Sequence, residues 1–528
     1  MPAFNLKSEI MKKILSVCLM LLFFAVSNSQ PLTSAQIDRI VEQAMTAFDV
    51  PGIAVAIVKD GKVIHSRGYG VRSVKTMQKV DENTLFAIAS NTKAFTAAAL
   101  GILVDEGKLK WEDKVTDYIP EFRLYSSYVT EDFIIKDLLT HRSGMGLGAG
   151  DLMIWPGTPD FNKDEVIHNL RYLRQTSPFR TRYDYDNLLY IVAGEVVARI
   201  SGISWEEFVE RRIMEPLGMT VSAASINRLR DRSNIIDAHV PVDGKLEVVP
   251  KHTGDLHNPV GGIMSSVADM SRWAIMQMNN GKYGTNPEKQ IFSEKVHDEM
   301  WTPQTIIAVR GSNAYNTHFA SYGLGWRLSD EKGYKVVGHT GSLQGVVTQV
   351  TLVPEMKLGI IVFTNQQSDA AFSVITNTIK DSYYGMTGYD WITEYKNRVT
   401  TSRENAAEVT EAVWEKIEDQ MNSTRVIPDF AQFTGTYTDA WFGDVTVSQM
   451  DGKLRFYAVK SPKLSGEMIY YTGNTFIVKW DDRTLDADAF AVFSLDKEGR
   501  PAGLTMEAIS PLTDFSFDFQ DLDFHIKR

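Results

Sequence analysis

The rest of the chain is organised around one stretch, Phe86-Ala87-Ile88-Ala89-Ser90-Asn91-Thr92-Lys93-Ala94-Phe95-Thr96-Ala97-Ala98-Ala99-Leu100. In a helix that begins at Ser90, the side chains of Ser90 and Lys93 share one face, one turn apart. The hydroxyl then stands at the positive end of the helix dipole, beside free backbone N–H groups. Lys93 is surrounded by alanines and Phe95, and poor solvation lowers the pKa of an amine. A serine in this setting can lose its proton near neutral pH.

Ser-x-x-Lys alone is a weak signal, because it is also typical of a capped and solvated helix start. Two later motifs along the chain strengthen the catalytic interpretation of this pattern. They are Tyr185-Asp186-Asn187 and His339-Thr340-Gly341.

Length and composition narrow the class of protein. The 528 residues are enough for two or three domains, and 44% hydrophobic with 23% charged residues is typical of a globular protein with a large core. The formal net charge of −11 argues against a nucleic-acid partner. The single cysteine, Cys18, excludes intramolecular disulfides and thiolate metal sites.

The N-terminus has the pattern of an export signal. Met11-Lys12-Lys13 is a basic start, residues 14–26 form an apolar run, and Ser27-Asn28-Ser29 supplies small residues for cleavage. About 13 apolar residues are too few to span a bilayer, which needs ~20. We therefore expect residues 1–29 to be an upstream extension and a signal peptide. The mature chain, from Gln30, is expected to be periplasmic or secreted and to lack a membrane span.

Helical and strand patterns alternate through residues 30–398, which we predict to form one α+β domain with an antiparallel sheet flanked by helices. Thr33 and Gln36 form a capping box at the start of an amphipathic helix that runs to Phe48. The other predicted elements are a hairpin over 53–58 and 63–69, helices over 90–106, 186–200, 205–213 and 266–279, strands over 346–353 and 358–364, and a closing helix over 372–384.

The sequence pattern changes near Val399. A charged helix over 404–421 falls within a predicted helical linker, residues 399–427, and residues 428–528 are predicted to be a separate all-β module, a small barrel. Its expected strands cover 435–438, 445–449, 454–459, 475–480, 489–495 and 515–519. Calcium binding or solvated turns would each account for Asp481, Asp482, Asp486 and Asp488, and we favour turns.

The three motifs, in this order, resemble those of the serine β-lactamase and penicillin-binding superfamily. The tyrosine in the second motif is closest to the class C β-lactamases and their relatives, which include D-aminopeptidases, DD-carboxypeptidases and esterases. The resemblance runs from Ser34 to Tyr384. It implies an all-α subdomain beside the sheet, a lipocalin-like barrel as an addition, and no cofactor or metal.

The resemblance also implies a role for each site residue. Ser90 would be the nucleophile, Tyr185 the general base as a phenolate, and Asn187 a ligand of Lys93 and of the substrate amide. The oxyanion hole would be formed by the backbone N–H groups of Ser90 and Ser342, which follows His339, Thr340 and Gly341. A free tyrosine has a pKa near ~10 and needs nearby cations to ionise, so the sequence leaves open whether Lys93 or Tyr185 is the base.

Other assignments compete with these. Tyr183 is an alternative to Tyr185, although the motif register favours Tyr185. His339 stands where β-lactamases have a lysine, and a mostly neutral imidazole holds a substrate carboxylate weakly, so efficient β-lactam turnover is not expected. A purely structural strand-end histidine is the alternative for His339.

The remaining motifs are predicted to be structural. The alternating glycines from Gly144 to Gly150 predict a loop at the edge of a cleft, because no strand leads into a helix there. We expect His141 and Arg142 to bond backbone carbonyls. His239, His252 and His257 are spaced too irregularly for a metal site.

The sequence thus predicts an exported serine hydrolase that forms an acyl-enzyme on an amide or ester of a peptide or cell-wall fragment. An esterase with little amide activity and a non-catalytic sensor of penicillin or peptidoglycan are the alternatives. The sequence leaves open whether the chain forms a homo-oligomer.

Overall fold

The computed structural model describes residues 31–285, 289–311, 313–421 and 428–527. The predicted signal peptide lies outside the described residues. The N-terminal domain is built on an eight-stranded antiparallel sheet in the order β2-β1-β12-β11-β10-β9-β8-β7. Its strands are β1 Gly52–Lys59, β2 Lys62–Gly70, β7 Thr305–Ile307, β8 Ala320–Tyr322, β9 Arg327–Glu331, β10 Tyr334–Leu343, β11 Val346–Val353 and β12 Leu358–Thr364.

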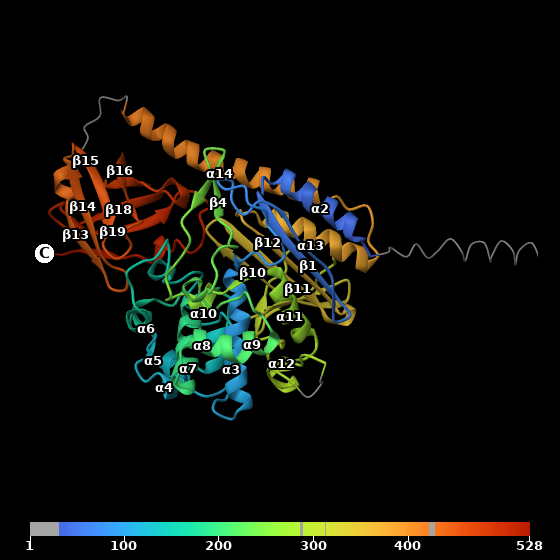
Figure 1. The fold of residues 1–528 in the computed structure, drawn as a ribbon. Coiled ribbons are helices and arrows are strands. Elements are labelled where there is room, and N and C mark those ends of the chain that lie inside the picture. Colours follow the sequence, from blue (N-terminus) through green and yellow to red (C-terminus); the bar gives the residue numbers. More distant parts are fainter. Residues whose placement is uncertain (1–30, 286–288, 312, 422–427, 528) are drawn as a thin grey trace, which may run out of the picture.

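Helices cover both faces of this sheet (Figure 1). On one face lie α2 Ser34–Ala47, whose capping box of Thr33 and Gln36 is present as predicted, and α13 Asp369–Tyr384. They bury one apolar cluster against β1 and β12. On the other face, α11 Val267–Met278 packs on β1 and β12. The sheet is therefore buried on both sides, which explains the continuous apolar runs of its central strands.

The rest of the N-terminal domain is a mainly helical subdomain beside the sheet, as the resemblance implied. At its centre is α3 Thr92–Asp105, which is apolar on every side and packs against α7 Leu188–Ser201. A helix of that composition belongs in a core. The other helices are α4 Val115–Tyr118, α5 Ser127–Asp132, α6 Lys163–Asn169, α8 Trp205–Val209, α9 Glu215–Leu217, α10 Asn258–Gly261 and α12 Glu294–Met300. Two short strand pairs, β3 Phe86–Ala87 with β6 Met264–Ser265 and β4 Ala238–Val242 with β5 Lys245–Val249, complete it.

Two helix predictions need correction. The helix expected from Glu404 begins at Trp391, so α14 Trp391–Met421 is one continuous helix through the residue where we placed the end of the first domain. The helix expected to close at Ile213 continues through a π-helical segment, Glu210–Met214, into α9. Pro216 follows the π-helical segment without ending the helix, which stops at Gly218.

The C-terminal module is a closed barrel of eight antiparallel strands, as predicted. They are β13 Gly435–Asp439, β14 Gly443–Met450, β15 Lys453–Ala458, β16 Ser465–Thr472, β17 Thr475–Trp480, β18 Ala489–Leu495, β19 Pro501–Ala508 and β20 Phe524–Ile526. The predicted strands did not include β16, β19 or β20. Gly466, Pro501 and Gly503 weaken the strand signal in the first two.

Residues 515–519 are not a strand, contrary to the prediction. Their alternating phenylalanines fit a strand pattern, but Phe515 and Phe517 pack against Tyr185 and Trp155 of the N-terminal domain. The segment between β19 and β20 therefore reaches across to the other domain instead of pairing in the barrel.

Among the described residues, no single helix is long and apolar enough to cross a membrane. One pair, α7 with Trp205–Leu217, meets the length and composition test jointly and is bent by 75°.

Candidate active site

Ser90 lies in a single 3₁₀ turn, Ala89–Asn91, directly before α3, so the helix begins two residues later than predicted. Ala89 has a positive φ of 48°, an uncommon conformation that a surrounding structure must hold in place. Thr348 of β11 supplies that support, because its hydroxyl donates to the carbonyl of Ile88 at 2.8 Å and accepts from the Asn91 amide at 2.9 Å. The turn that carries Ser90 is thus held against the sheet.

Gly341 explains why the third motif needs a glycine. A Cβ at this position would lie 2.2 Å from the Ile88 carbonyl oxygen and 2.9 Å from the Cβ of Ala89. No side chain fits there, so glycine lets β10 approach the turn that carries Ser90.

Lys93 is fully buried and lies at the centre of the site. Its Nζ donates to Ser90 Oγ at 3.0 Å and to Asn187 Oδ1 at 2.7 Å. Among the described residues no carboxylate forms an ion pair with it, although Asp151 and Asp186 are close enough to favour its charge. Burial outweighs them and lowers the pKa of Lys93 to about 7, so a large fraction of this amine is neutral near neutral pH.

Asn187 precedes α7 and uses its side chain for the site instead of capping the helix. Its Nδ2 donates to Asp151 Oδ2 at 2.7 Å, which turns Oδ1 toward Lys93. Asp151 is fully buried, and burial raises the pKa of its carboxyl to about 7. The sequence analysis did not single out Asp151, whose only signal is its position after the glycine-rich loop.

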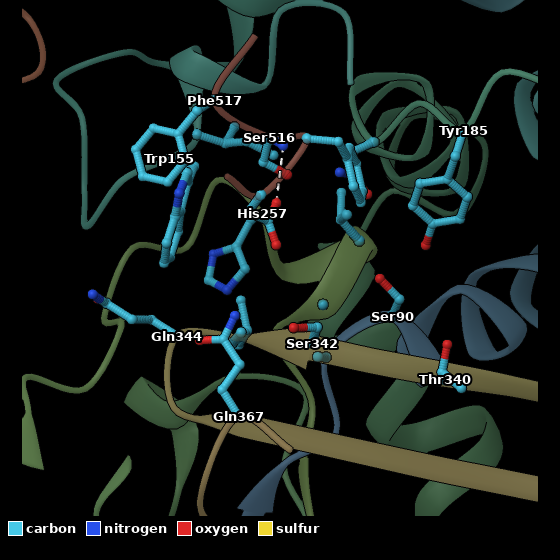
Figure 2. A pocket seen from close by; sticks show the side chains of 18 of the residues that line it. Ser90, Trp155, Tyr185, His257, Thr340, Ser342, Gln344, Gln367, Ser516 and Phe517 are labelled. Carbon is cyan, nitrogen blue, oxygen red and sulfur yellow. Dashed lines mark hydrogen bonds between the residues drawn. The ribbon is translucent and has the colours of Figure 1, made fainter. Parts of the chain in front are cut away.

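Tyr185 lies beside Ser90 in the cavity, and Figure 2 shows the two hydroxyls pointing toward each other. The ammonium of Lys93 lies 4.8 Å from the centre of the Tyr185 ring. Burial raises the pKa of Tyr185 far above its ordinary value, so this environment disfavours the phenolate that the resemblance implied. The structure brings Tyr185 to Ser90, whereas the hydroxyl of Tyr183 is buried without a hydrogen-bond partner.

A cavity of about 580 Å³ opens beside Ser90 and is lined by residues of both domains. Thr340 and Ser342 of β10 form one wall, with Ser90 and Tyr185 across from them (Figure 2). Ser90 begins a helical segment, where backbone N–H groups lack partners within the helix. This arrangement leaves room for a substrate carbonyl between the two predicted oxyanion donors.

His339 lines the cavity, but both of its ring nitrogens are engaged within the protein. Nε2 is 2.8 Å from the Tyr322 hydroxyl, and Nδ1 is 2.6 Å from the carbonyl oxygen of Thr340. Burial and the nearby cations hold the pKa of His339 well below its usual value. The imidazole is therefore neutral and supports the wall, which matches the structural alternative.

Arg327 is the cation that the sequence analysis missed. It is exposed on β9 where this strand pairs with Gly338, next to His339, and it lines the cavity. Its guanidinium lies 5.5 Å from the Tyr183 ring and 6.0 Å from the Tyr185 ring. In the described part of the chain it forms no ion pair. Only the tertiary pairing of β9 with β10 brings it to this place.

The motifs predicted to be structural lie around the site. His141 is buried with its ring 4.1 Å from that of Tyr185, and its Nδ1 accepts the backbone N–H of Asp186, so it does not bond a carbonyl as predicted. Arg142 does donate to a carbonyl, that of Gln304, and also to Asp137. The glycines from Gly144 to Gly150 form a loop with positive φ angles, as expected.

The candidate metal ligands have other partners. Asp481, Asp482 and Asp488 pair with Arg455, Lys463 and Arg483. His252 and His257 contact each other at the cavity wall, with ring centres 3.9 Å apart and an angle of 59° between the rings. Among the described residues no group of three or more His, Cys, Asp or Glu is arranged to hold a metal ion.

Comparisons with known proteins agree with this architecture. Residues 37–383 match the family model of beta-lactamase, and residues 428–525 match a domain of unknown function (DUF3471). The chain therefore belongs to the beta-lactamase family.

The similar proteins include enzymes and structural neighbours. The unguisins hydrolase ungD of Aspergillus violaceofuscus is 26% identical over 81% of this chain and 79% of its own length. Protein flp of Staphylococcus aureus (strain NCTC 8325 / PS 47) is 27% identical over 63% of each chain. The octameric penicillin-binding protein homologue from Pyrococcus abyssi shares the fold, with a TM-score of 0.60 and 21% identity over 93% of this chain and all of its own.

Proposed function

We propose that this protein is an exported serine hydrolase that cleaves an amide or ester bond of a peptide or cell-wall fragment through an acyl-enzyme on Ser90. The observation that carries the proposal is the convergence of Tyr185 with the distant pair Ser90 and Lys93 at one cavity. Lys93 Nζ donates to Ser90 Oγ at 3.0 Å and lies 4.8 Å from the centre of the Tyr185 ring. A nucleophile within hydrogen-bond reach of a base that a third group orients is the signature of covalent catalysis.

Lys93 is the better candidate for the base. Burial moves its pKa toward the working range of a general base, whereas burial moves the pKa of Tyr185 away from it. The neutral amine takes the Ser90 proton as Oγ attacks the substrate carbonyl carbon. The oxygen that becomes negative is stabilised by the backbone N–H groups of Ser90 and Ser342, each worth ~3 kcal/mol in comparable sites.

Tyr185 then serves as the acid. Its phenol gives a proton to the leaving nitrogen or oxygen as the bond to the carbonyl carbon breaks, and the Lys93 ammonium returns a proton to the phenol oxygen. Water attacks the acyl-enzyme by the reverse proton path and releases the acid product. The cycle restores neutral Lys93, protonated Tyr185 and free Ser90.

The shape and charge of the cavity support a peptide-like substrate that carries a carboxylate. Arg327 provides a cation beside the third motif, where His339 is neutral, and guanidinium binds carboxylate in a two-pronged geometry. The name of the fungal relative, a hydrolase of unguisins, also supports hydrolysis as the type of reaction. We propose a peptide with a free carboxylate as the substrate class.

Labelling of the purified enzyme tests this proposal. A fluorophosphonate should add one adduct to the wild-type protein, seen by intact mass, and peptide mapping should place it on Ser90. Ser90→Ala should stay unlabelled and inactive while keeping the melting temperature of the wild type. A wild-type protein that takes no adduct, or an adduct that persists in Ser90→Ala, would contradict the assignment. A panel of D- and L-peptides and nitrophenyl esters then separates a peptidase from an esterase.

Export and self-association are part of the same proposal. The pattern of residues 11–29 supports export, and N-terminal sequencing of the protein from a periplasmic or culture-medium fraction should begin near Gln30. Light scattering of the mature protein tests for an oligomer such as the one named for the Pyrococcus homologue.

A further inference from the structure

We propose that the C-terminal barrel completes the active site, with Ser516 acting as a positioning residue that holds Asp151 and, through Asn187, orients the Lys93 amine. This inference rests on the proposed function of Lys93 as the base. It gives the barrel a direct part in the chemistry of the other domain.

Four hydrogen bonds connect the barrel to the nucleophile. Ser516 Oγ donates to Asp151 Oδ2 at 2.8 Å, and Asn187 Nδ2 donates to the same oxygen at 2.7 Å. Asn187 Oδ1 then accepts from Lys93 Nζ at 2.7 Å, and Nζ donates to Ser90 Oγ at 3.0 Å. Asp151 and Lys93 are fully buried and Asn187 is 8% exposed, so little solvent reaches the inner bonds, while Ser516 and Ser90 at the two ends line the cavity. In such surroundings each bond constrains the next one.

The segment that carries Ser516 is fixed to the N-terminal domain on both sides of this residue. The buried carboxylate of Asp518 accepts the backbone N–H groups of Gly150 at 2.6 Å and Leu152 at 3.1 Å, on either side of Asp151. Phe515 occupies the space that a side chain at position 148 would need, because a Cβ on Gly148 would lie 2.5 Å from the Phe515 carbonyl oxygen. Residues of both domains are therefore shaped for this contact: Gly148 leaves room for Phe515, and Asp518 bonds the backbone around Asp151.

The barrel also reaches the opposite side of the cavity. Gln344, two residues after Ser342, donates to the carbonyl and the hydroxyl of Thr484, both at 2.9 Å. Figure 2 shows Ser516 and Phe517 on one side of the cavity and Gln344 with Ser342 on the other. The two barrel segments thus hold both walls around Ser90.

The charge of Asp151 matters for Lys93. The other ionisable groups that act on the Lys93 amine are Asp186, which favours its charge, and Arg327, which opposes it. The neighbouring titratable side chains are His141, His257, His339, Tyr185 and Tyr190. Asp151 itself feels Asp514 and Asp518 of the barrel and Lys93. The Ser516 hydroxyl lowers the pKa of Asp151 and so keeps this carboxyl more often negative.

Loss of the Ser516 hydroxyl has two consequences. Asp151 becomes neutral more often, so the Lys93 amine loses part of the negative field that favours its protonation, and the pKa of Lys93 falls further. Asp151 also loses one of the two donors that hold its Oδ2, so the Asn187 amide that bonds the same oxygen is held less firmly. A weaker and less well-oriented base slows acylation, and the pH at which the base becomes protonated moves down.

The test uses the full-length mature protein with Ser516→Ala, Ser516→Thr and, as a matched control, Gln520→Ala at an exposed position of the same segment. The reactions are fluorophosphonate labelling and hydrolysis of a nitrophenyl ester between pH 5 and 9. For Ser516→Ala we expect kcat/KM at the plateau to fall about tenfold and the acidic limb of the pH profile to shift to lower pH. Ser516→Thr keeps the hydroxyl and should recover most of the rate, and Gln520→Ala should match the wild type.

The outcomes separate this inference from the proposed function. If the wild type is labelled at Ser90 and Ser516→Ala shows the plateau and the acidic limb of the wild type, the positioning role is wrong and the proposed function stands. If Ser516→Thr is as slow as Ser516→Ala, the side chain contributes packing and not its hydrogen bond. If the wild type itself is not labelled, the proposed function fails, and this inference fails with it.

Discussion

Two lysines are buried on opposite faces of the same sheet, and one strand, β9, acts on both of them. Lys93 on α3 is fully buried, and Arg327 at the start of β9 adds a like charge nearby. Lys380 on α13 is 5% exposed and forms an ion pair of 2.7 Å with Glu331 at the end of β9. Each ammonium also lies over a tyrosine ring, Tyr185 at 4.8 Å and Tyr315 at 4.2 Å.

The two lysines differ in the charge of the side chains that bond their buried amines. Burial lowers the pKa of both lysines, but Glu331 offsets much of that effect at Lys380, so its ammonium belongs to a structural pair. At Lys93 the direct partners are the neutral Asn187 and Ser90, so the amine can give up its proton. A buried lysine with a carboxylate partner stabilises the fold, whereas one with neutral partners is suited to proton transfer.

Replacing each lysine by methionine should give opposite results, and this is the largest effect that we expect. Lys93→Met should lower kcat/KM about 10³-fold with little loss of stability, because it removes a base and a poorly solvated charge. Lys380→Met should keep nearly full activity but lower the free energy of unfolding by about 3 kcal/mol, because Glu331 is left without its cation. Ester hydrolysis and urea denaturation measure the two effects. Equal loss of activity in both variants would contradict the comparison.

Removing the hydroxyl of the tyrosine beside each lysine, Tyr185 or Tyr315, tests the same difference between a catalytic and a structural site. Tyr185→Phe should slow acylation about 10²-fold, because the leaving group loses its proton donor. Tyr315→Phe should leave acylation unchanged and cost about 1–2 kcal/mol of unfolding free energy, because the hydroxyl donates to Asp381 at 2.9 Å. Single-turnover labelling measures the rate of acylation, and thermal denaturation measures the loss of stability. Tyr183→Phe is the control within the site, and a loss as large as that of Tyr185→Phe would overturn the assignment of Tyr185.

The pH dependence of the wild type tests the protonation state of Lys93. We expect kcat/KM to fall about tenfold per pH unit below pH 7, because Lys93, with a pKa of about 7, then carries a proton and cannot act as a base. The unfolded chain keeps this proton up to its ordinary pKa of 10.5, so the cost of burying the Lys93 amine falls steadily as the pH rises from 7 to 10.5. The wild type should therefore gain stability relative to Lys93→Met over this window. A kcat/KM that keeps rising through pH 10 would instead indicate Tyr185 as the base, because burial raises the pKa of this phenol.

The smallest effect is expected at Arg327. Arg327→Gln should raise KM about tenfold for a substrate with a free carboxylate and leave KM for a neutral ester unchanged. Removing the like charge should also raise the pKa of Lys93 and move the acidic limb to higher pH. The pair of substrates is the internal control, and an equal rise in KM for both would contradict carboxylate binding. Glu331→Gln, at the other end of β9, should change stability and not KM.

The sequence predicted much of the fold because local patterns carry it. The capping box at Thr33, the hairpin of β1 and β2, and the alternation of most barrel strands are set by residues close in the chain. The strand prediction over 515–519 was wrong because alternating phenylalanines do not specify their partners. Phe515 contacts Tyr185 and Phe517 contacts Trp155 of the other domain, whereas Phe519 packs on Trp480 of the barrel.

The amino-acid sequence by itself determined the family and the spacing of Ser90 and Lys93, since three residues of helix bring two side chains to one face whatever surrounds them. The tertiary structure alone decided the protonation of the site, because burial and neighbouring charges set a pKa and depend on contacts between distant segments. It placed Asp151 behind Asn187, Arg327 beside His339, and Ser516 of the barrel within hydrogen-bond distance of Asp151.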